Sequence, residues 1–219
     1  MAQVQYDLCV ITRAVPQLGR GHLDIARAAL EGGARFLQFR NKHMTTRELV
    51  ETAGELRRLT RQYGGMLVVN DRVDVALAVG ADGVHLGNDD MPVSEARRLL
   101  GPDAIIGASA ATVESARAAE AAGADYLGVG PIFATGSKAD AGEAIGLGPM
   151  QQVKAAVELP LLAVGGITAG NVSQVIRAGA DGVAVISAVS EADDMAAATA
   201  ELLQRIASAR GEQEAGEVG

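Results

Sequence analysis

Eight short apolar runs of β type alternate with helical stretches along this chain, and this alternation constrains the fold more than any other feature. The helical stretches, such as 45–63 and 112–123, carry apolar residues at helical spacing. Eight strand–helix units in a chain of this length predict an α/β fold, a closed (β/α)8 TIM barrel in a single domain. The predicted strands are 7–12, 35–40, 66–70, 83–87, 105–109, 126–130, 161–166 and 182–187.

A Gly-Ala pair precedes the second, fourth, sixth and eighth predicted strands, in GGAR, VGAD, AGAD and AGAD. The glycine after each helix suits a left-handed C-cap, so we interpret this echo as structural. An open doubly wound sheet is the alternative fold, although the first strand lacks the GxGxxG loop typical of it. We expect the barrel to occupy 1–210 and the small, acidic tail 211–219 to be disordered.

The composition argues against several functional classes. With 27 Asp and Glu against 19 Lys and Arg, the net charge of -8 disfavours binding to nucleic acid or an anionic membrane. No run reaches the roughly 18 apolar residues of a membrane span, and the N-terminus does not resemble a signal peptide. The single cysteine, Cys9, excludes an intrachain disulfide and suits the cytoplasm. A homodimer is the default expectation for the assembly.

Two acidic residues follow neighbouring predicted strands, Asp71 in VVNDR and Asp90 in HLGNDD. In a barrel the carboxyl ends of the strands and the connections after them form the active-site mouth. Two carboxylates there predict a Mg²⁺ site, because Mg²⁺ takes one or two protein carboxylates together with phosphate oxygens and water. The alternative for each residue is that it caps the following helix.

Basic residues are predicted at the same mouth. Strand alternation in LQFRNK sends Gln38, Arg40 and Lys42 to one face, and Phe39 and Asn41 to the other. If the first face is the lumen, two cations and an amide converge there. A solvated rim is the alternative for the two cations.

Anion-binding chemistry also follows the later strands. The loop after the sixth strand offers hydroxyls, small residues and a lysine, which suit phosphate oxygens: Thr135, Gly136, Ser137 and Lys138. The seventh and eighth predicted strands end in Gly165, Gly166 and Ser187, at the usual phosphate position of a barrel. Two separated anion sites at one rim suit a diphosphate at one end and a monophosphate at the other.

Five motifs in order, over about residues 8–190, resemble those of the thiamine-phosphate synthase family: QFRNK, VVNDRVDVALAVGADGVHLGNDD, GVGPIFATGSK, AVGGIT and GVAVIS. The resemblance implies a transferase that couples hydroxymethylpyrimidine diphosphate to a thiazole phosphate carboxylate and forms thiamine phosphate. It also implies dissociative chemistry, in which pyrophosphate leaves before the thiazole nitrogen captures the pyrimidine methylene cation.

The same resemblance implies roles for individual residues. Asp71 and Asp90 would bind Mg²⁺, and Arg40, Lys42, Ser109 and Lys138 would be catalytic. The pyrimidine diphosphate would be held by Gln38, Arg40, Lys42, Asn70, Ser109 and Lys138. The thiazole phosphate would lie among Thr135, Ser137, Gly166, Ile186 and Ser187. Neighbouring positions in these motifs complete the expected substrate-binding set: Phe39, Asn41, Gly136 and Gly165.

The chain departs from the family pattern at Asn41, where Glu is usual, at Asn88, where Gln is usual, and at Ala110-Ala111, where Thr-His is usual. The last departure bears on the choice of pyrimidine. Of the histidines, His85 is expected to be packed and hydrogen-bonded, whereas His22 has no partner that the sequence identifies.

Two other functions stay open at this point. One is a thiazole tautomerase of the same fold, which would not need the acidic pair. The other is a phosphate-ligand binding protein without turnover.

Overall fold

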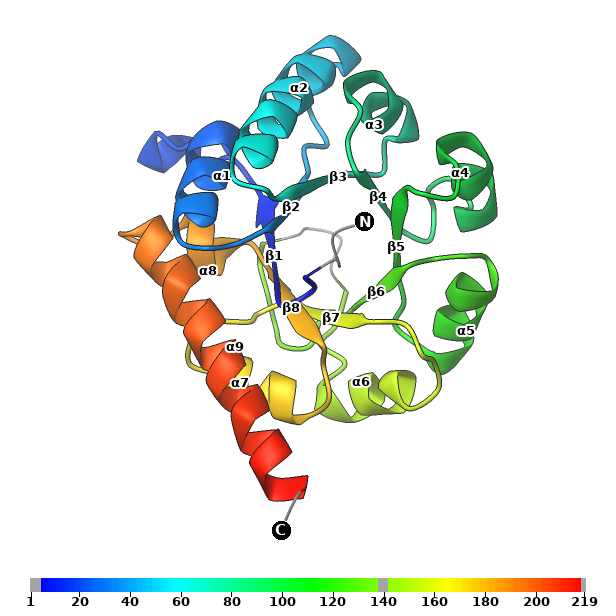
Figure 1. Ribbon diagram of the computed structural model, residues 1–219, viewed down its shortest axis with the longest axis vertical. Coiled ribbons are helices and arrows are strands. Elements are labelled where there is room, and N and C mark those ends of the chain that lie inside the picture. The colour runs from blue at the N-terminus through cyan, green and yellow to red at the C-terminus, as the bar shows by residue number, and fades with distance from the viewer. Residues whose placement is uncertain (1–4, 138–141, 218–219) are drawn as a thin grey trace.

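The computed structural model describes residues 5–137 and 142–217, and its eight parallel strands close into one barrel (Figure 1). Each strand pairs with the next, and β8 pairs with β1 through Leu8 and Val183. No strand end differs from its predicted position by more than two residues, so the closed barrel is confirmed and the open sheet is wrong. The strands are β1 (Leu8–Thr12), β2 (Phe36–Phe39), β3 (Met66–Asn70), β4 (Gly83–Leu86), β5 (Ile105–Ser109), β6 (Tyr126–Val129), β7 (Leu161–Val164) and β8 (Gly182–Val185).

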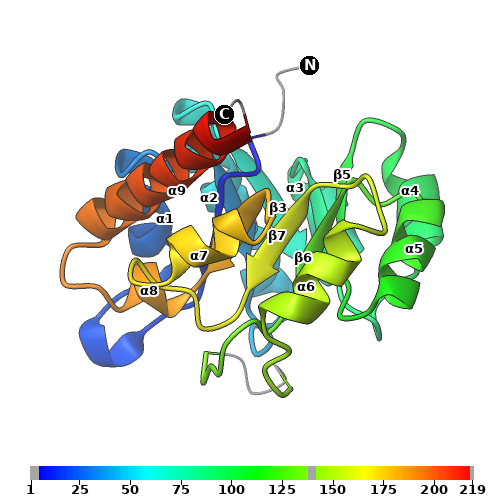
Figure 2. The same ribbon diagram turned by 90° about the horizontal axis from the view of Figure 1, so that it is seen from below.

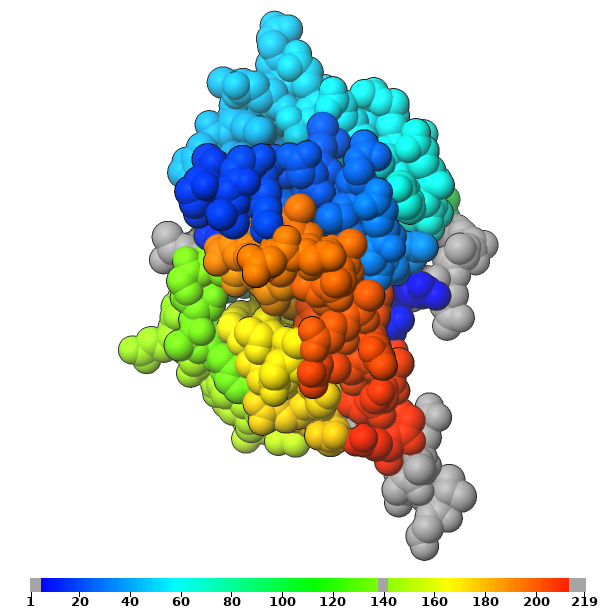
Figure 3. All heavy atoms as spheres, turned by 90° about the vertical axis from the view of Figure 1, so that its left-hand side faces the viewer, coloured from blue at the N-terminus to red at the C-terminus, as the bar shows by residue number. Residues whose placement is uncertain are grey.

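Helices surround the barrel in chain order (Figure 1). They are η1 (Pro16–Leu18), α1 (His22–Glu31), α2 (Thr46–Gln62), α3 (Val73–Val79), α4 (Val93–Leu100), α5 (Val113–Ala121), α6 (Leu147–Lys154), α7 (Val172–Arg177), α8 (Ser187–Ser190) and α9 (Met195–Glu217). The last of these, α9, packs between α1 and α7 and closes the ring (Figure 3). No helix in the described part of the chain is long and apolar enough to cross a membrane.

The apolar residues form two layers, because strand alternation sends successive side chains to opposite faces of the barrel. The larger layer, with Leu37 and Phe39 of β2, lies between strands and helices. The smaller layer fills the lumen with Cys9, Phe36 and Tyr126. Substrate-facing groups must therefore come from the lumen or from the connections after the strands.

The repeated Gly-Ala-Asp motif makes the same kind of contact each time it occurs, at the amino end of the barrel. Its glycines have positive φ, 60° at Gly80, 92° at Gly123 and 100° at Gly179, so the left-handed turns are confirmed. The aspartate of each echo accepts a backbone N–H from the strand before it, at 2.7 to 2.8 Å, and pairs with a cation on an earlier helix. The three sets are Asp82 with Leu67 and Arg57, Asp125 with Ile106 and Arg97, and Asp181 with Leu161 and Lys154.

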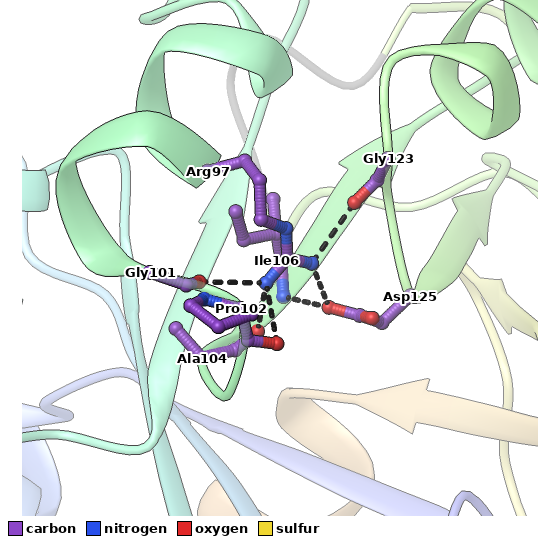
Figure 4. Close-up of polar contacts among 7 residues, drawn as sticks. All are labelled: Arg97, Gly101, Pro102, Ala104, Ile106, Gly123 and Asp125. Atoms are coloured by element: carbon purple, nitrogen blue, oxygen red, sulfur yellow. Dashed lines mark hydrogen bonds and ion pairs between the residues drawn. The ribbon is translucent and has the colours of Figure 1, made fainter.

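Arg97 makes the most extensive of these contacts (Figure 4). Its guanidinium donates to Asp125 Oδ2 at 2.6 Å, and to the carbonyls of Ala104 at 2.6 Å, Gly123 at 2.9 Å and Gly101 at 3.1 Å. The side chain is 23% exposed. One residue of α4 therefore joins the turns at the start of β5 and β6.

We expect Arg97→Met to lower the free energy of unfolding by about 2 kcal/mol, because carbonyls and a carboxylate lose their donor while the apolar stem is kept. Urea unfolding measures this change. Arg98→Met is the matched control on the same helix, since Arg98 is 69% exposed and pairs only with Glu95 among the contacts described, and it should stay within about 0.5 kcal/mol of the parent. Equal unfolding midpoints for the two variants would contradict a stabilising role for Arg97.

The C-terminal segment differs from the expected disorder. Helix α9 continues through Glu217, and Arg177 of α7 pairs with Glu212 at 2.6 Å. The segment GEQEAGE holds several good helix formers, so it extends a helix that tertiary packing has already nucleated.

Candidate active site

A cavity of about 380 Å³ opens at the carboxyl ends of the strands. The described parts of the connection between β6 and α6, residues 130–137 and 142–146, project from this end of the barrel, at the lower edge of the view in Figure 2. The volume is in the range of small-molecule sites. The predicted mouth of the barrel is therefore the place where a ligand fits.

Asp71 and Asp90 meet at this cavity, as predicted. Strands β3 and β4 pair in register at Asn70 and His85, so the connections that follow them lie side by side. The Asp71 backbone N–H donates to the His85 carbonyl at 2.9 Å, and Asp90 Oδ2 accepts the Gly87 N–H at 2.7 Å. The two carboxyl groups are within hydrogen-bonding reach of each other.

Helix capping does not explain the pair. The N-cap of α3 is Arg72 and that of α4 is Pro92, so neither acid occupies a cap position. The Asp90 carboxylate accepts a hydrogen bond from the N–H of Gly87, a residue that belongs to no helix. The capping alternative is wrong for both residues.

The pKa of Asp71 reflects its burial and its closeness to Asp90. Burial, followed by the hydrogen bond and the negative charge of Asp90, raises the pKa of Asp71 from its ordinary value of 3.8 to about 6. The positive charges of Lys42 and Arg40 act in the opposite direction and do not cancel it. A cation bound between the two carboxylates would relieve this repulsion.

The backbone at Asp71 is strained. Its φ of 63° is the only positive φ at a non-glycine residue in the described ranges 5–137 and 142–217. The Arg72 N–H donates to the Asn70 carbonyl at 2.7 Å, which closes a three-residue turn around Asp71. Such a conformation costs on the order of 1–3 kcal/mol and persists where a side chain must be held in one direction.

Arg40 and Lys42 line the cavity on the side of β2, so the predicted convergence of cations and acids is present. Lys42 Nζ lies 3.9 Å from Asp71 Oδ2. Asn70, at the end of β3, lines the same side. One end of the cavity thus combines two cations, an amide and two carboxylates.

Below this end, the lumen forms a polar floor. His85 bonds through Nδ1 to the Tyr126 hydroxyl at 3.0 Å and through Nε2 to Ser109 Oγ at 3.1 Å. Gln38 is 3% exposed and does not line the main cavity; it lines a separate small hollow of about 30 Å³ beside these residues. Its Oε1 is buried, and no group in the described part of the chain bonds to it.

The opposite end of the cavity offers hydroxyl and backbone groups. Ser137 and Ser187 are joined through their hydroxyls at 3.0 Å, and the Ser137 N–H donates to Thr135 Oγ1 at 3.2 Å. Gly165 and Gly166 line the same cavity, with φ of 98° and 64°. Ile186 also lines this end.

Some predicted residues lie elsewhere. Phe39 is 1% exposed in the layer between strands and helices, and Asn41 is turned toward α1, so strand alternation is confirmed but neither residue lines the cavity. Gly136 is also absent from the lining among the residues described. Lys138 lies outside the described residues.

Other residues enter the lining that were not predicted as site residues. His85 is packed and hydrogen-bonded as expected, yet it also faces the cavity. Asp89, Ala110 and Ala111 line it as well. Each lies at or just after the end of a strand, which is the signal that could have found them. Among the described residues, no group of three or more His, Cys, Asp or Glu could hold a metal without other ligands.

Comparison with known proteins gives a consistent result. Residues 8–189 match the family model described as thiamine monophosphate synthase. The thiamine-phosphate synthase of Methanoculleus marisnigri is 53% identical, over 94% of this chain and 98% of its own. That of Moorella thermoacetica is 52% identical, over 94% of this chain and 99% of its own. The solved structure of a thiamine phosphate pyrophosphorylase from Pyrococcus furiosus superposes with a TM-score of 0.85 at 45% identity, over 94% of this chain and 97% of its own.

Proposed function

The chain belongs to the thiamine monophosphate synthase family, and from that premise we propose how its own residues carry out the synthase reaction. The activity is that of a thiamine-phosphate synthase, a transferase. The substrates we propose are 4-amino-2-methyl-5-hydroxymethylpyrimidine diphosphate and a thiazole phosphate carboxylate, with pyrophosphate as the second product. The observation that carries the proposal is the pairing of Asp71 with Asp90 beside Arg40 and Lys42.

Asp71 and Asp90 are the residues that would hold Mg²⁺. Two carboxylates in contact, one with its pKa raised to about 6, suit a hard divalent cation, and two protein ligands are typical of Mg²⁺ sites shared with phosphate. Bound there, Mg²⁺ would supply positive charge to the diphosphate oxygens of the substrate.

Arg40 and Lys42 act on the same diphosphate. Fixed cations stabilise charge that grows on a leaving pyrophosphate more than charge already spread in the bound substrate, and this difference lowers the barrier. Asn70 adds a neutral amide at this end. Lys138 belongs to the same proposal, on the grounds of the sequence resemblance.

The polar floor holds the pyrimidine. The buried Oε1 of Gln38 has no partner in the described part of the chain, so it is available to an amino group of the ligand. Ser109 is held by His85, which is held in turn by Tyr126. This chain of bonds fixes the Ser109 hydroxyl at the level where the reacting methylene would lie.

The hydroxyl and backbone end receives the thiazole phosphate. Thr135, Ser137 and Ser187 offer hydroxyls, and Gly166 allows a phosphate to approach the backbone. We place the thiazole at this end and the pyrimidine on the floor, which would turn the thiazole nitrogen toward the carbon from which pyrophosphate departs. The cations and hydroxyls position both partners, and no residue need act as a nucleophile.

The direct test mixes both substrates with Mg²⁺ and measures pyrophosphate and thiamine phosphate. We expect the two products in equal amounts, and none when either substrate is left out or EDTA is added. Conversion of the thiazole phosphate without pyrophosphate release would establish a tautomerase. Binding without any product would establish a non-catalytic protein. Either of these two outcomes would overturn the proposal.

The raised pKa of Asp71 predicts a pH dependence of metal binding. A cation binds the carboxylate form, so protons compete with it as the pH falls through about 6. Between pH 7.5 and pH 5.0 the affinity for Mn²⁺, used alone as a spectroscopic probe, should fall about tenfold, whereas a carboxyl titrating near 4 would change it by less than about a tenth. Electron paramagnetic resonance of free Mn²⁺ gives the affinity, and a value independent of pH over this range would contradict the assignment.

We also propose that the enzyme works in the cytoplasm, since a chain with one cysteine, Cys9, can form no intrachain disulfide. The homodimer stays a prediction, and sedimentation would test it.

A further inference from the structure

The Asn41 side chain pins the connection between β2 and α2 from outside the barrel. Its Oδ1 accepts the backbone N–H of His43 at 2.9 Å and of Met44 at 3.0 Å. Two donors facing one atom fix which end of the amide is oxygen. The other end, Nδ2, lies 3.0 Å from Nε2 of His22.

This geometry determines the state of His22. Because an amide nitrogen only donates, Nε2 of His22 must accept, and the imidazole is neutral with its proton on Nδ1. Nδ1 lies 2.9 Å from Thr12 Oγ1, which in turn lies 3.5 Å from the Gln38 carbonyl. The bonds run in one direction, from Asn41 through His22 and Thr12 to the backbone of β2.

The surroundings of His22 favour the neutral form. His22 is 5% exposed, and its contacts from β1, from β2 and from the connection, namely Thr12, Phe39 and Asn41, are all uncharged. The nearest acid on its own helix, Asp24, is bonded to the Gly21 N–H. Burial lowers the pKa of His22 to about 4.

The same connection between β2 and α2 contains the two basic residues of the site, Arg40 and Lys42. Arg40 and Lys42 flank Asn41 in sequence and line the cavity, whereas neither Asn41 nor His22 does so. Holding the backbone through Asn41 on the outer face directs its two neighbours inward. Thr45, at the end of the connection, is fixed separately by its capping box with Glu48.

We propose that Asn41 and His22 are positioning residues for the synthase reaction, which hold the backbone of residues 41–44 so that Arg40 and Lys42 face the substrate diphosphate. This inference rests on the proposed binding of the diphosphate by Arg40 and Lys42. The pair touches no substrate and acts through the backbone alone.

Steady-state kinetics of Asn41→Leu test this role. Leucine has a similar volume but cannot accept the two N–H groups, so KM for the pyrimidine diphosphate should rise about tenfold while KM for the thiazole phosphate stays within about twofold. His43→Ala is the matched control, because that side chain is exposed in the same connection, and both KM values should match the parent. Equal changes in both KM values, or none, in a folded Asn41→Leu variant would overturn the proposal.

A conservative variant separates positioning from packing. Asn41→Asp keeps the oxygen that accepts from His43 and Met44, so it should retain a KM within about threefold of the parent. Its second oxygen can only accept a hydrogen bond, so Nε2 of His22 must carry a proton and donate to it, and the His22 pKa should rise above about 6 in an NMR titration. A KM as high as that of Asn41→Leu would overturn the proposal.

One measurement needs no variant. In the parent at pH 7, the ¹⁵N shifts of His22 should identify a neutral ring protonated on Nδ1, and a ring protonated on Nε2 or on both nitrogens would overturn the proposed chain of bonds. Failure of the function itself would be recognised separately, as a parent that releases no pyrophosphate. Failure of this inference would leave an active parent and an Asn41→Leu variant with unchanged KM values.

Discussion

Replacement of Asp71 by asparagine is expected to slow thiamine phosphate synthesis by about a thousandfold, with the folded state retained. A metal that stabilises a leaving group contributes several kcal/mol, and each 1.4 kcal/mol is about tenfold in rate. Asparagine is the right replacement, because it tolerates the positive φ of 63° at this position better than alanine does. Asp71→Ala would add backbone strain to the loss of the carboxylate. Initial rates of pyrophosphate release at saturating Mg²⁺ measure the effect.

Asp90→Asn should have a similar effect, since its amide oxygen can still accept the Gly87 N–H while the negative charge is lost. The double variant should be little slower than either single one, because a site that has lost one of two ligands has already lost the metal. Asp74→Asn is the matched control. It removes the same charge three residues from Asp71, but from a carboxylate that is 61% exposed and paired with Arg72. A variant of Asp71 or Asp90 that keeps more than about a tenth of the parental rate would remove the metal assignment.

Much of the barrel could be predicted because local signals agree with the global fold. Each strand is an apolar run that stops at a polar or glycine-rich segment, so its ends are marked in the sequence. The meeting of Asp71 and Asp90 followed from topology, since the carboxyl ends of neighbouring parallel strands share one rim. Alternation along β2 correctly separated Arg40 and Lys42 from Phe39 and Asn41.

What could not be predicted depends on partners far apart in the chain. The Gly-Ala-Asp repeat includes Asp125, but the hydrogen bond from Arg97 to Asp125 joins residues 28 positions apart and forms only when α4 is packed on the barrel. His22 was assigned no partner, although Asn41 lies 19 residues away and bonds to it. The sequence VVNDR does not indicate the positive φ at Asp71. That conformation is imposed by the hydrogen bond from its N–H to His85 of β4 and by the tight turn that Asp71 occupies. These are tertiary constraints on residues whose local preferences are ordinary.

The second prediction with a large expected effect concerns the glycine pair after β7, Gly165 and Gly166. A Cβ on Gly166 would lie 2.7 Å from the Ala134 carbonyl oxygen and 2.7 Å from Phe133 Cβ, and its φ is 64°. Strand β7 and the connection after β6 are tied here, because the Phe133 N–H donates to the Gly165 carbonyl at 3.1 Å. Any side chain at Gly166 must therefore displace the segment that leads to Thr135 and Ser137.

We accordingly expect Gly166→Ala to raise KM for the thiazole phosphate about thirtyfold, from roughly 2 kcal/mol of strain and lost phosphate contacts, while KM for the pyrimidine diphosphate changes less than about threefold. Gly170→Ala is the control in the same connection, because its Cβ would meet only Thr168 Oγ1, at 3.7 Å, and it should match the parent. Competition by inorganic phosphate against the thiazole phosphate adds a second readout, which should weaken in Gly166→Ala alone. In the proposed assignment the acidic pair serves the pyrimidine diphosphate and Gly166 the thiazole phosphate, so a rise in both KM values would contradict two separate anion sites in one cavity.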